Sequence, residues 1–245
     1  MPHGIKSNTI PSIPMNPFRC ILDLFFPPVC AGCSKVLDDA GLIVCEQCRQ
    51  SLSVTEHATH TDNKVSGLFT DIKKIDKAAA FCHYDHENTI YKLIHALKYY
   101  NHPKVGIWLG REAANHFLSK SPRWFEGIDC IIPVPLHKKR LKSRKYNQAE
   151  LIADGISSVT GIPVDTRHLV RIVNNPTQTQ RTPEERRQNT QGIFTLQHAE
   201  ELRNRHILLV DDIITTGSTL RAVMAILSPV KRLTVSILTI AEAGN

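Results

Sequence analysis

Apolar residues follow two patterns that alternate along the chain. Short β-branched or apolar runs predict buried strands, and longer segments with apolar residues three and four positions apart predict amphipathic helices. The expected strands are 78–83, 128–134, 207–210 and 233–240, and the expected helices are 88–99, 103–118, 148–160 (closed by Gly161) and 218–227 (stopped by Pro229). Because strands alternate with helices, we predict an α/β fold with a mostly parallel sheet flanked by helices.

This pattern divides the chain into three regions. Residues 1–17 contain Pro and Asn without a usable period and are predicted to be a disordered lead-in. Residues 18–52 form a small cysteine-containing module, and residues 53–245 form the larger domain, which begins with a polar, irregular linker or loop at 53–77. No apolar run approaches the roughly 18–20 residues that a membrane-spanning helix needs, and we expect no signal peptide.

Four of the seven cysteines occur in two CxxC pairs, Cys30 with Cys33 and Cys45 with Cys48. Two such pairs on facing turns can complete a tetrahedral Cys₄ site, for which structural Zn²⁺ is the expected ion. An iron–sulfur cluster is the alternative, whereas a thioredoxin-like redox pair is disfavoured because no βαβ pattern surrounds the motifs. Metal binding would supply the folding free energy that so small a module lacks. The remaining Cys20, Cys82 and Cys130 are of a residue type that is most often a buried small hydrophobe.

The most informative segment runs from Ile207 to Arg221, where four apolar residues precede two acids and a hydroxyl-rich turn that opens a helix. The carboxyl end of a strand is where open α/β sheets bind ligands. Gly217 allows successive backbone N–H groups to point inward and bind a phosphate at the helix N-terminus. Asp211 and Asp212 would repel that phosphate, so we expect them to bind a ribose diol, with Mg²⁺ between the ribose and a diphosphate. The hydroxyl donors expected for the phosphate are Thr215, Thr216, Ser218 and Thr219. An ordinary turn with a Ser or Thr helix cap is the alternative.

The chain has a net charge of +7 and an isoelectric point near 9.1, and much of its positive charge lies in two basic segments. Residues 138–145 contain six cations and no acid, and residues 175–189 are polar and basic without apolar periodicity. The first segment is either an arm that closes over a diphosphate or a strip that contacts a nucleic-acid backbone; a charged loop tip without a partner is the alternative. Tyr146 is a candidate for base stacking, with Tyr99 and Tyr100 as further candidates. For Lys98, Tyr99 and Tyr100 the preferred interpretation is the end of an amphipathic helix.

The acidic pair and its turn resemble the phosphoribosyl diphosphate signature of type I phosphoribosyltransferases. Together with the Cys₄ module, Leu97-Lys98-Tyr99, the Pro-Val-Pro turn and the basic segments, their order along about residues 18–240 resembles the ComF family of bacterial competence proteins. This resemblance implies a type I phosphoribosyltransferase fold behind an N-terminal zinc ribbon. It also implies a cytoplasmic role in natural transformation, in which incoming single-stranded DNA is handled at the inner membrane, with DNA-uptake or recombination proteins as expected partners.

The resemblance also implies roles for individual residues. Asp211 and Asp212 would orient the ribose of phosphoribosyl diphosphate, and the loop from Thr215 to Thr219 would hold its 5′-phosphate. The residues expected to contact or frame the diphosphate are Pro133, Val134, Arg144, Asn147, Gln148, Arg181 and Arg186.

Three functions stay open at this point. The chain is a DNA-handling competence protein, a phosphoribosyltransferase with an unidentified acceptor, or a sensor that binds phosphoribosyl diphosphate without turnover.

Overall fold

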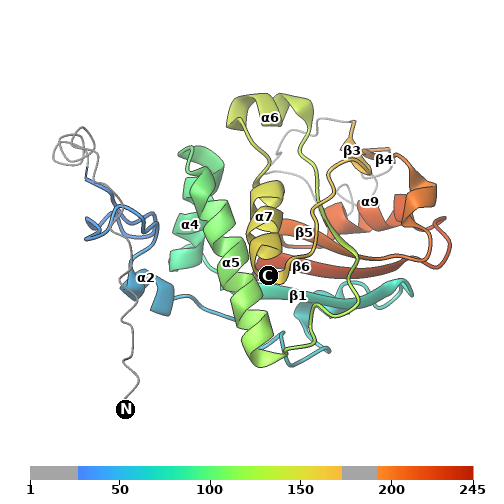
Figure 1. Ribbon diagram of the computed structural model, residues 1–245, viewed down its shortest axis with the longest axis horizontal. Coiled ribbons are helices and arrows are strands. Elements are labelled where there is room, and N and C mark those ends of the chain that lie inside the picture. The colour runs from blue at the N-terminus through green and yellow to red at the C-terminus, as the bar shows by residue number, and fades with distance from the viewer. Residues whose placement is uncertain (1–26, 173–191, 245) are drawn as a thin grey trace, which may run out of the picture.

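The computed structural model describes residues 27–172 and 192–244 of the chain (Figure 1). The predicted lead-in at residues 1–17, together with Cys20, Arg181 and Arg186, lies outside the described residues. No helix within the described ranges is long and apolar enough to cross a membrane.

The centre of the larger domain is a four-stranded sheet in the order β1-β6-β5-β2, and every neighbouring pair in it is parallel. Its strands are β1 (Ile75–Tyr84), β2 (Cys130–Pro133), β5 (His206–Ile214) and β6 (Thr234–Ala243). A second, two-stranded antiparallel sheet consists of β3 (Leu169–Arg171) and β4 (Phe194–Leu196). The predicted α/β class with a parallel sheet is confirmed.

Helices cover both faces of the sheet (Figure 1). Leu208 and Val210 of β5 point into the core that α4, α5 and α7 share, whereas the alternate residues Ile207 and Leu209 point into a second core with α9. This alternation follows from the two-residue period of a strand. The helices are α2 (Glu46–Gln50), α3 (Lys64–Gly67), α4 (Thr89–Tyr99), α5 (Pro103–Lys120), α6 (Lys138–Arg144), α7 (Gln148–Thr160), the 3₁₀ helix η1 (Ala199–Leu202) and α9 (Ser218–Leu227).

The structure corrects the interpretation of residues 53–77 as an irregular linker. This segment contains α3, and its Val65 and Phe69 are buried in the α9-side core. The Arg221 guanidinium on α9 donates to the Asp71 carboxylate at 2.7 and 3.0 Å and to the Leu68 carbonyl at 2.6 Å. The polar composition of the segment conceals these few anchoring side chains, which is why its sequence resembles a free loop.

Two further elements differ from the sequence prediction. Strand β5 continues to Ile214, past the predicted end at residue 210, because its parallel pairing with β6 continues as far as Ile214 and Glu242. The basic segment forms the helix α6, which begins after His137 and ends at Lys145 in the left-handed conformation. The cations of residues 138–145 are therefore arranged around a helix instead of along a loop tip.

Helices α5 and α7 approach each other closely through two glycines. A Cβ atom on Gly110 would lie 2.1 Å from the Ile152 carbonyl oxygen, and one on Gly155 would lie 2.2 Å from the Ile107 carbonyl oxygen. Because the obstacle in each case is backbone, no side-chain rotation can relieve the clash. The two helices can pack at this distance only with glycine at both positions.

We expect Gly155→Ala to lower the free energy of unfolding by about 2–3 kcal/mol, as overpacking of a tight core does. The opposite sign would follow from helix propensity alone, since Ala normally stabilises a helix by about 1 kcal/mol relative to Gly. Chemical denaturation of the variant measures the difference. Gly67→Ala is the matched control, because nothing lies within 4 Å of its added Cβ; equal losses in the two variants would contradict the packing argument.

Candidate functional site

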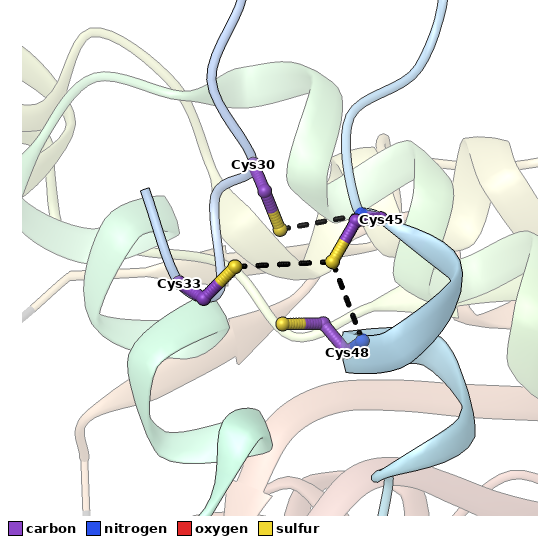
Figure 2. Close-up of side chains that lie close together, drawn as sticks. All are labelled: Cys30, Cys33, Cys45 and Cys48. Atoms are coloured by element: carbon purple, nitrogen blue, oxygen red, sulfur yellow. Dashed lines mark hydrogen bonds between the residues drawn. The ribbon is translucent and has the colours of Figure 1, made fainter. Parts of the chain in front are cut away.

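The four cysteines of the N-terminal module converge on one point (Figure 2). Their Sγ atoms all lie within 4.8 Å of one another, and those of Cys33 and Cys45 are 3.8 Å apart. Tetrahedral zinc with Zn–S bonds of about 2.3 Å requires sulfur atoms about 3.8 Å apart. The donor set and its spacing therefore fit a closed zinc site with four protein ligands, as predicted.

Backbone N–H groups around the cluster favour thiolates. Both the Cys45 and the Gly32 N–H donate to Cys30 Sγ, at 3.2 and 3.4 Å, and the Cys48 N–H donates to Cys45 Sγ. Burial alone would raise the pKa of Cys30, but these donors outweigh burial and lower it to about 7. Burial and the neighbouring thiols raise the pKa of Cys48. A bound cation would favour the thiolate at all four positions, because zinc coordinates the deprotonated sulfur.

The module is attached to the helices of the larger domain. The Ser51 and Thr89 hydroxyl oxygens lie 2.7 Å apart at the start of α4, and Arg49 Nε donates to Glu112 Oε2 on α5 at 2.9 Å. Cys30 and Cys48 are themselves part of the core shared with α4 and α5. The folded module thus supports the N-terminal end of α4.

A second site opens where β2 leaves the sheet. The pairing of β2 with β5 ends at Pro133 opposite Val210, and the Val134 N–H makes one further bond to the Val210 carbonyl. Pro135 has no N–H with which to extend this pairing, and the chain turns away from the sheet there. Beyond this point β5 is paired with β6, as far as Ile214. The result is a cleft of about 210 Å³ beside Asp211 and Asp212.

The two carboxylates in this cleft have different surroundings. Burial, followed by the charge of Asp212, raises the pKa of Asp211 to about 7. Asp212 forms an ion pair with Lys98 at the end of α4, with Nζ and Oδ2 2.9 Å apart. Their oxygens also accept backbone N–H bonds, from Asp212 at 2.9 Å and from Ile213 at 2.7 Å. The pair therefore combines one carboxylate near its midpoint at neutral pH with one that a lysine balances.

Cationic and amide groups form the rest of the cleft wall. Arg171 from β3 has a pKa lowered by burial and then by Arg140, and its Nε is buried without a hydrogen-bond partner among the described residues. Gln148, 1% exposed, accepts a bond from Arg144 but has no described partner for its Nε2. A buried donor without an acceptor is costly, so both side chains are ready to bind an anionic oxygen.

The turn after β5 is formed as predicted. Gly217 has φ +70° and is the N-cap of α9, and no side chain caps the helix there. Two features restrict substitution of Gly217. Its positive φ favours glycine, and an added Cβ would lie 3.2 Å from the Phe69 ring. The alternative of an ordinary Ser or Thr cap is therefore wrong, and among the described residues the N–H groups of the first turn of α9 have no side-chain acceptor.

The predicted site residues are only partly brought together. Those that line the cleft are Val134, Arg144, Asn147, Gln148, Asp211, Asp212 and Thr219. Pro133 is buried in β2, and Asn147 acts as a structural cap, donating to the Val134 carbonyl and accepting from the Ala149 N–H. The lining does not include Thr215, Thr216, Gly217 or Ser218, which form the adjoining turn.

Two cationic side chains of the cleft, Lys98 and Arg171, were not assigned to it from sequence, whereas Arg140 belongs to the basic segment that was expected to close over the diphosphate. Lys98 corrects the interpretation of this position as a mere helix end, because it reaches Asp212. The expectation that Tyr146 stacks on a base is also corrected. Its hydroxyl donates to the Leu97 carbonyl at 2.7 Å, and its ring packs against the core. Nothing in the local sequence pattern distinguishes an inward lysine from a solvated one.

Comparison with known proteins finds a family match in each of the two regions that contain these sites. Residues 21–59 match the double zinc ribbon domain, and residues 149–245 match the phosphoribosyl transferase domain. Competence protein F of Haemophilus influenzae is 30% identical over 221 residues, which cover 86% of this chain and 90% of that protein. The DNA utilization protein YhgH of Salmonella typhimurium is 26% identical over 55% of this chain and 59% of its own length.

Among solved structures, the glutamine phosphoribosylpyrophosphate amidotransferase from B. subtilis is 20% identical, with a TM-score of 0.37 over 58% of this chain and 30% of that one. The matches to the two domains support structural zinc in the cysteine cluster and a type I phosphoribosyltransferase fold behind it.

We expect one zinc ion per chain, measured by elemental analysis of the purified protein. Cys45→Ala should abolish zinc binding and lower the free energy of unfolding by at least about 2 kcal/mol, because metal binding supplies folding free energy. Cys82→Ala is the control, because Cys82 is buried in the core outside the cluster. This variant should keep its full zinc content. Full zinc content in Cys45→Ala would contradict the assignment of the four ligands.

Proposed function

Because the chain belongs to the ComF family of competence proteins, we propose that its phosphoribosyltransferase domain binds phosphoribosyl diphosphate with Mg²⁺ and that the protein handles incoming single-stranded DNA. The observation that carries the first part is a cleft in which two carboxylates face several cations beside an uncapped helix N-terminus. Such a cleft suits a ligand that combines hydroxyl groups with phosphates.

The carboxylates are assigned to the ribose. Asp211 and Asp212 accept hydrogen bonds and cannot bind a phosphate directly, whereas ribose hydroxyls donate to carboxylates. Carboxylates and phosphates are oxygen ligands that Mg²⁺ prefers, so Asp211 and Asp212 would help to hold the ion, which would supply positive charge to the diphosphate. Lys98 balances the charge of Asp212 in the free protein and holds that carboxylate at the cleft.

The 5′-phosphate is assigned to the turn before α9. The helix is ten residues long, its first N–H groups have no side-chain cap, and the hydroxyls of Thr215 and Thr216 are exposed beside them. A helix N-terminus favours an anion through both its N–H groups and its dipole. This arrangement supports the turn as the phosphate site.

The diphosphate is assigned to the opposite wall. Arg140, Arg144 and Arg171 come from α6 and β3, and the Gln148 amide adds a donor without a described partner. Arginine and amide donors are suited to phosphate oxygens, and several of them together neutralise a diphosphate. The predicted contacts of Arg181 and Arg186 remain part of this proposal.

Binding alone leaves two outcomes for the chemistry. In a transferase, a nucleophile attacks the ribose C1, the bond from C1 to the diphosphate oxygen breaks, and the diphosphate leaves with its electron pair. The protein would act mainly by positioning and by charge neutralisation. In a sensor, the ligand binds without turnover. Release of diphosphate in the presence of candidate acceptors separates the two.

The DNA-handling part rests on the family and on charge. Relatives carry the names competence protein and DNA utilization protein. Helix α6 exposes lysines, and residues 137–149 contain no acid. We place this activity at the cytoplasmic side of the inner membrane, with DNA-uptake or recombination proteins as partners.

We expect Asp211→Asn with Asp212→Asn to weaken binding of phosphoribosyl diphosphate, measured by calorimetry with Mg²⁺, by about 100-fold, since charged hydrogen bonds contribute about 1.5–3 kcal/mol each. Asp38→Asn with Asp39→Asn removes the same two charges from adjacent exposed positions in the N-terminal module. That control should bind like the natural protein. Equal affinity in both double variants would contradict the assignment of the ribose.

The pH dependence provides an internal check of this assignment. Because Asp211 has a raised pKa of about 7 and would bind Mg²⁺ and the ribose as a carboxylate, affinity should rise as the pH increases through 7. Asp211→Asn should lose this part of the pH dependence. Titration of the ligand's own phosphates is common to both proteins, so the difference between their pH profiles isolates the carboxylate.

Single-strand binding should be salt-dependent. Each phosphate contact contributes about 0.7 to the slope of log affinity against log salt concentration for single strands. We expect Lys138→Ala, Lys139→Ala and Lys142→Ala together to reduce this slope by up to about 2, measured by fluorescence anisotropy. The charge-matched control replaces Lys73, Lys120 and Lys231, exposed cations that precede β1, β2 and β6 at the opposite edge of the sheet. Equal slopes for the two triple variants would contradict a role for α6.

A further inference from the structure

The exposed side of α4 carries a row of rings, of which only Tyr99 lines the carboxylate cleft. The Tyr91 and His95 rings are stacked with centroids 5.7 Å apart, and His95 is followed by Tyr99 at 4.6 Å and Tyr100 at 5.2 Å. We call these four residues the α4 ring row. They recur at helical spacing, which places them on one side of the helix.

The outer end of the row is unusually exposed for such large side chains. Tyr99 is 62% exposed and Tyr100 is 65% exposed, while the opposite side of the same helix is fully buried through Ile90, Leu93 and Leu97. Contacts between the rings stabilise the helix modestly, but they leave most of the Tyr99 and Tyr100 ring surface exposed. A ligand with planar rings would cover this surface.

The row lies between two hollows. On one side, Tyr91, His95 and Tyr100 line a cavity of about 430 Å³ whose other wall is residues 29–34 of the zinc module. On the other side, Tyr99 lines the carboxylate cleft, where its ring lies 5.5 Å from the Arg144 guanidinium. The row therefore connects the zinc module with the proposed diphosphate site.

Exposed lysines flank the row along α4, whereas Asp85 and Glu87 lie beyond its Tyr91 end, next to His86. Residues 89–104 contain Lys92, Lys98 and Lys104 and no acid, and the acid-free helix α6 faces the same end of α4 through Arg144 and Tyr99. Lys98 is balanced by Asp212, so Lys92 and Lys104 supply the exposed charge beside the rings. Aromatic faces flanked by cations are the features that bind single-stranded nucleic acid, because bases stack on the rings and phosphates contact the cations.

We propose that the α4 ring row is the base-stacking track for single-stranded DNA, along which a strand runs from the zinc-module cavity past Tyr100 to the cleft at Tyr99. The inference rests on the proposed DNA-handling function and adds to it the residues that contact the bases. Phosphate contacts come from Lys92, Lys104 and the exposed lysines of α6. The bases themselves are read by stacking, so the track takes any sequence.

The test measures binding of a fluorescent oligothymidylate by anisotropy to His95→Ala, Tyr100→Ala and their combination. Each variant should bind between about fivefold and a hundredfold more weakly, the range that loss of one base–aromatic stack gives. Because no lysine or arginine is removed, the salt slope of Tyr100→Ala should equal that of the natural protein. Tyr100→Phe keeps the ring and should restore binding.

Controls separate this inference from the function on which it rests. Leu42→Ala removes another exposed apolar side chain, 50% exposed, from the zinc module and should bind the oligonucleotide normally. Tyr100→Ala should also keep its affinity for phosphoribosyl diphosphate, since Tyr100 does not line the cleft. If the natural protein binds no single strand at low salt, the proposed function fails. If it binds and the ring variants bind as tightly, the track is wrong while the function stands.

Discussion

The early end of β2 is the constraint on which the functional region depends. Four parallel strands would pair along their whole length if the chain allowed it, but β2 stops at Pro133 while β5 and β6 stay paired as far as Ile214 and Glu242. The difference leaves a gap at the carboxyl edge of the sheet. Into this gap project the acids of β5, the arginines of α6 and β3, and the lysine at the end of α4. Ligand sites in open α/β sheets lie at such edges.

Like charges lie close together in this region, so they repel one another. Two adjacent carboxylates repel each other, and burial adds to the cost of ionising Asp211. Lys98 offsets part of this cost through its ion pair with Asp212. Across the cleft, Arg140 and Arg171 repel each other in the same way. A ligand that offers hydroxyl groups to the acids and phosphates to the cations would relieve both sets of repulsion at once, which is the physical basis of the proposed preference for a phosphorylated sugar.

Helix α4 connects the two sites that the sequence motifs mark separately. It begins at Thr89 against Ser51 of the zinc module and ends with Lys98 against Asp212. The zinc module therefore contacts the same helix that holds Lys98 beside the cleft. The same helix buries one side in the core and exposes the α4 ring row on the other, so the module, the cleft and the proposed DNA track share one rigid support.

Several features were determined by the sequence alone. The two CxxC pairs predicted a Cys₄ site, the alternating periodicities predicted a parallel α/β sheet, and Gly217 after two acids predicted a turn that opens a helix. These features depend on local spacing or on a single backbone conformation, so neighbouring residues carry the information. Tertiary structure decided the role of Lys98, Arg171 and Tyr146, together with the burial of Val65 and Phe69 in a segment that resembled a linker. Each of these side chains contacts a group that is distant in the sequence. The local pattern of apolar and polar residues contains no information about which distant group a side chain will contact.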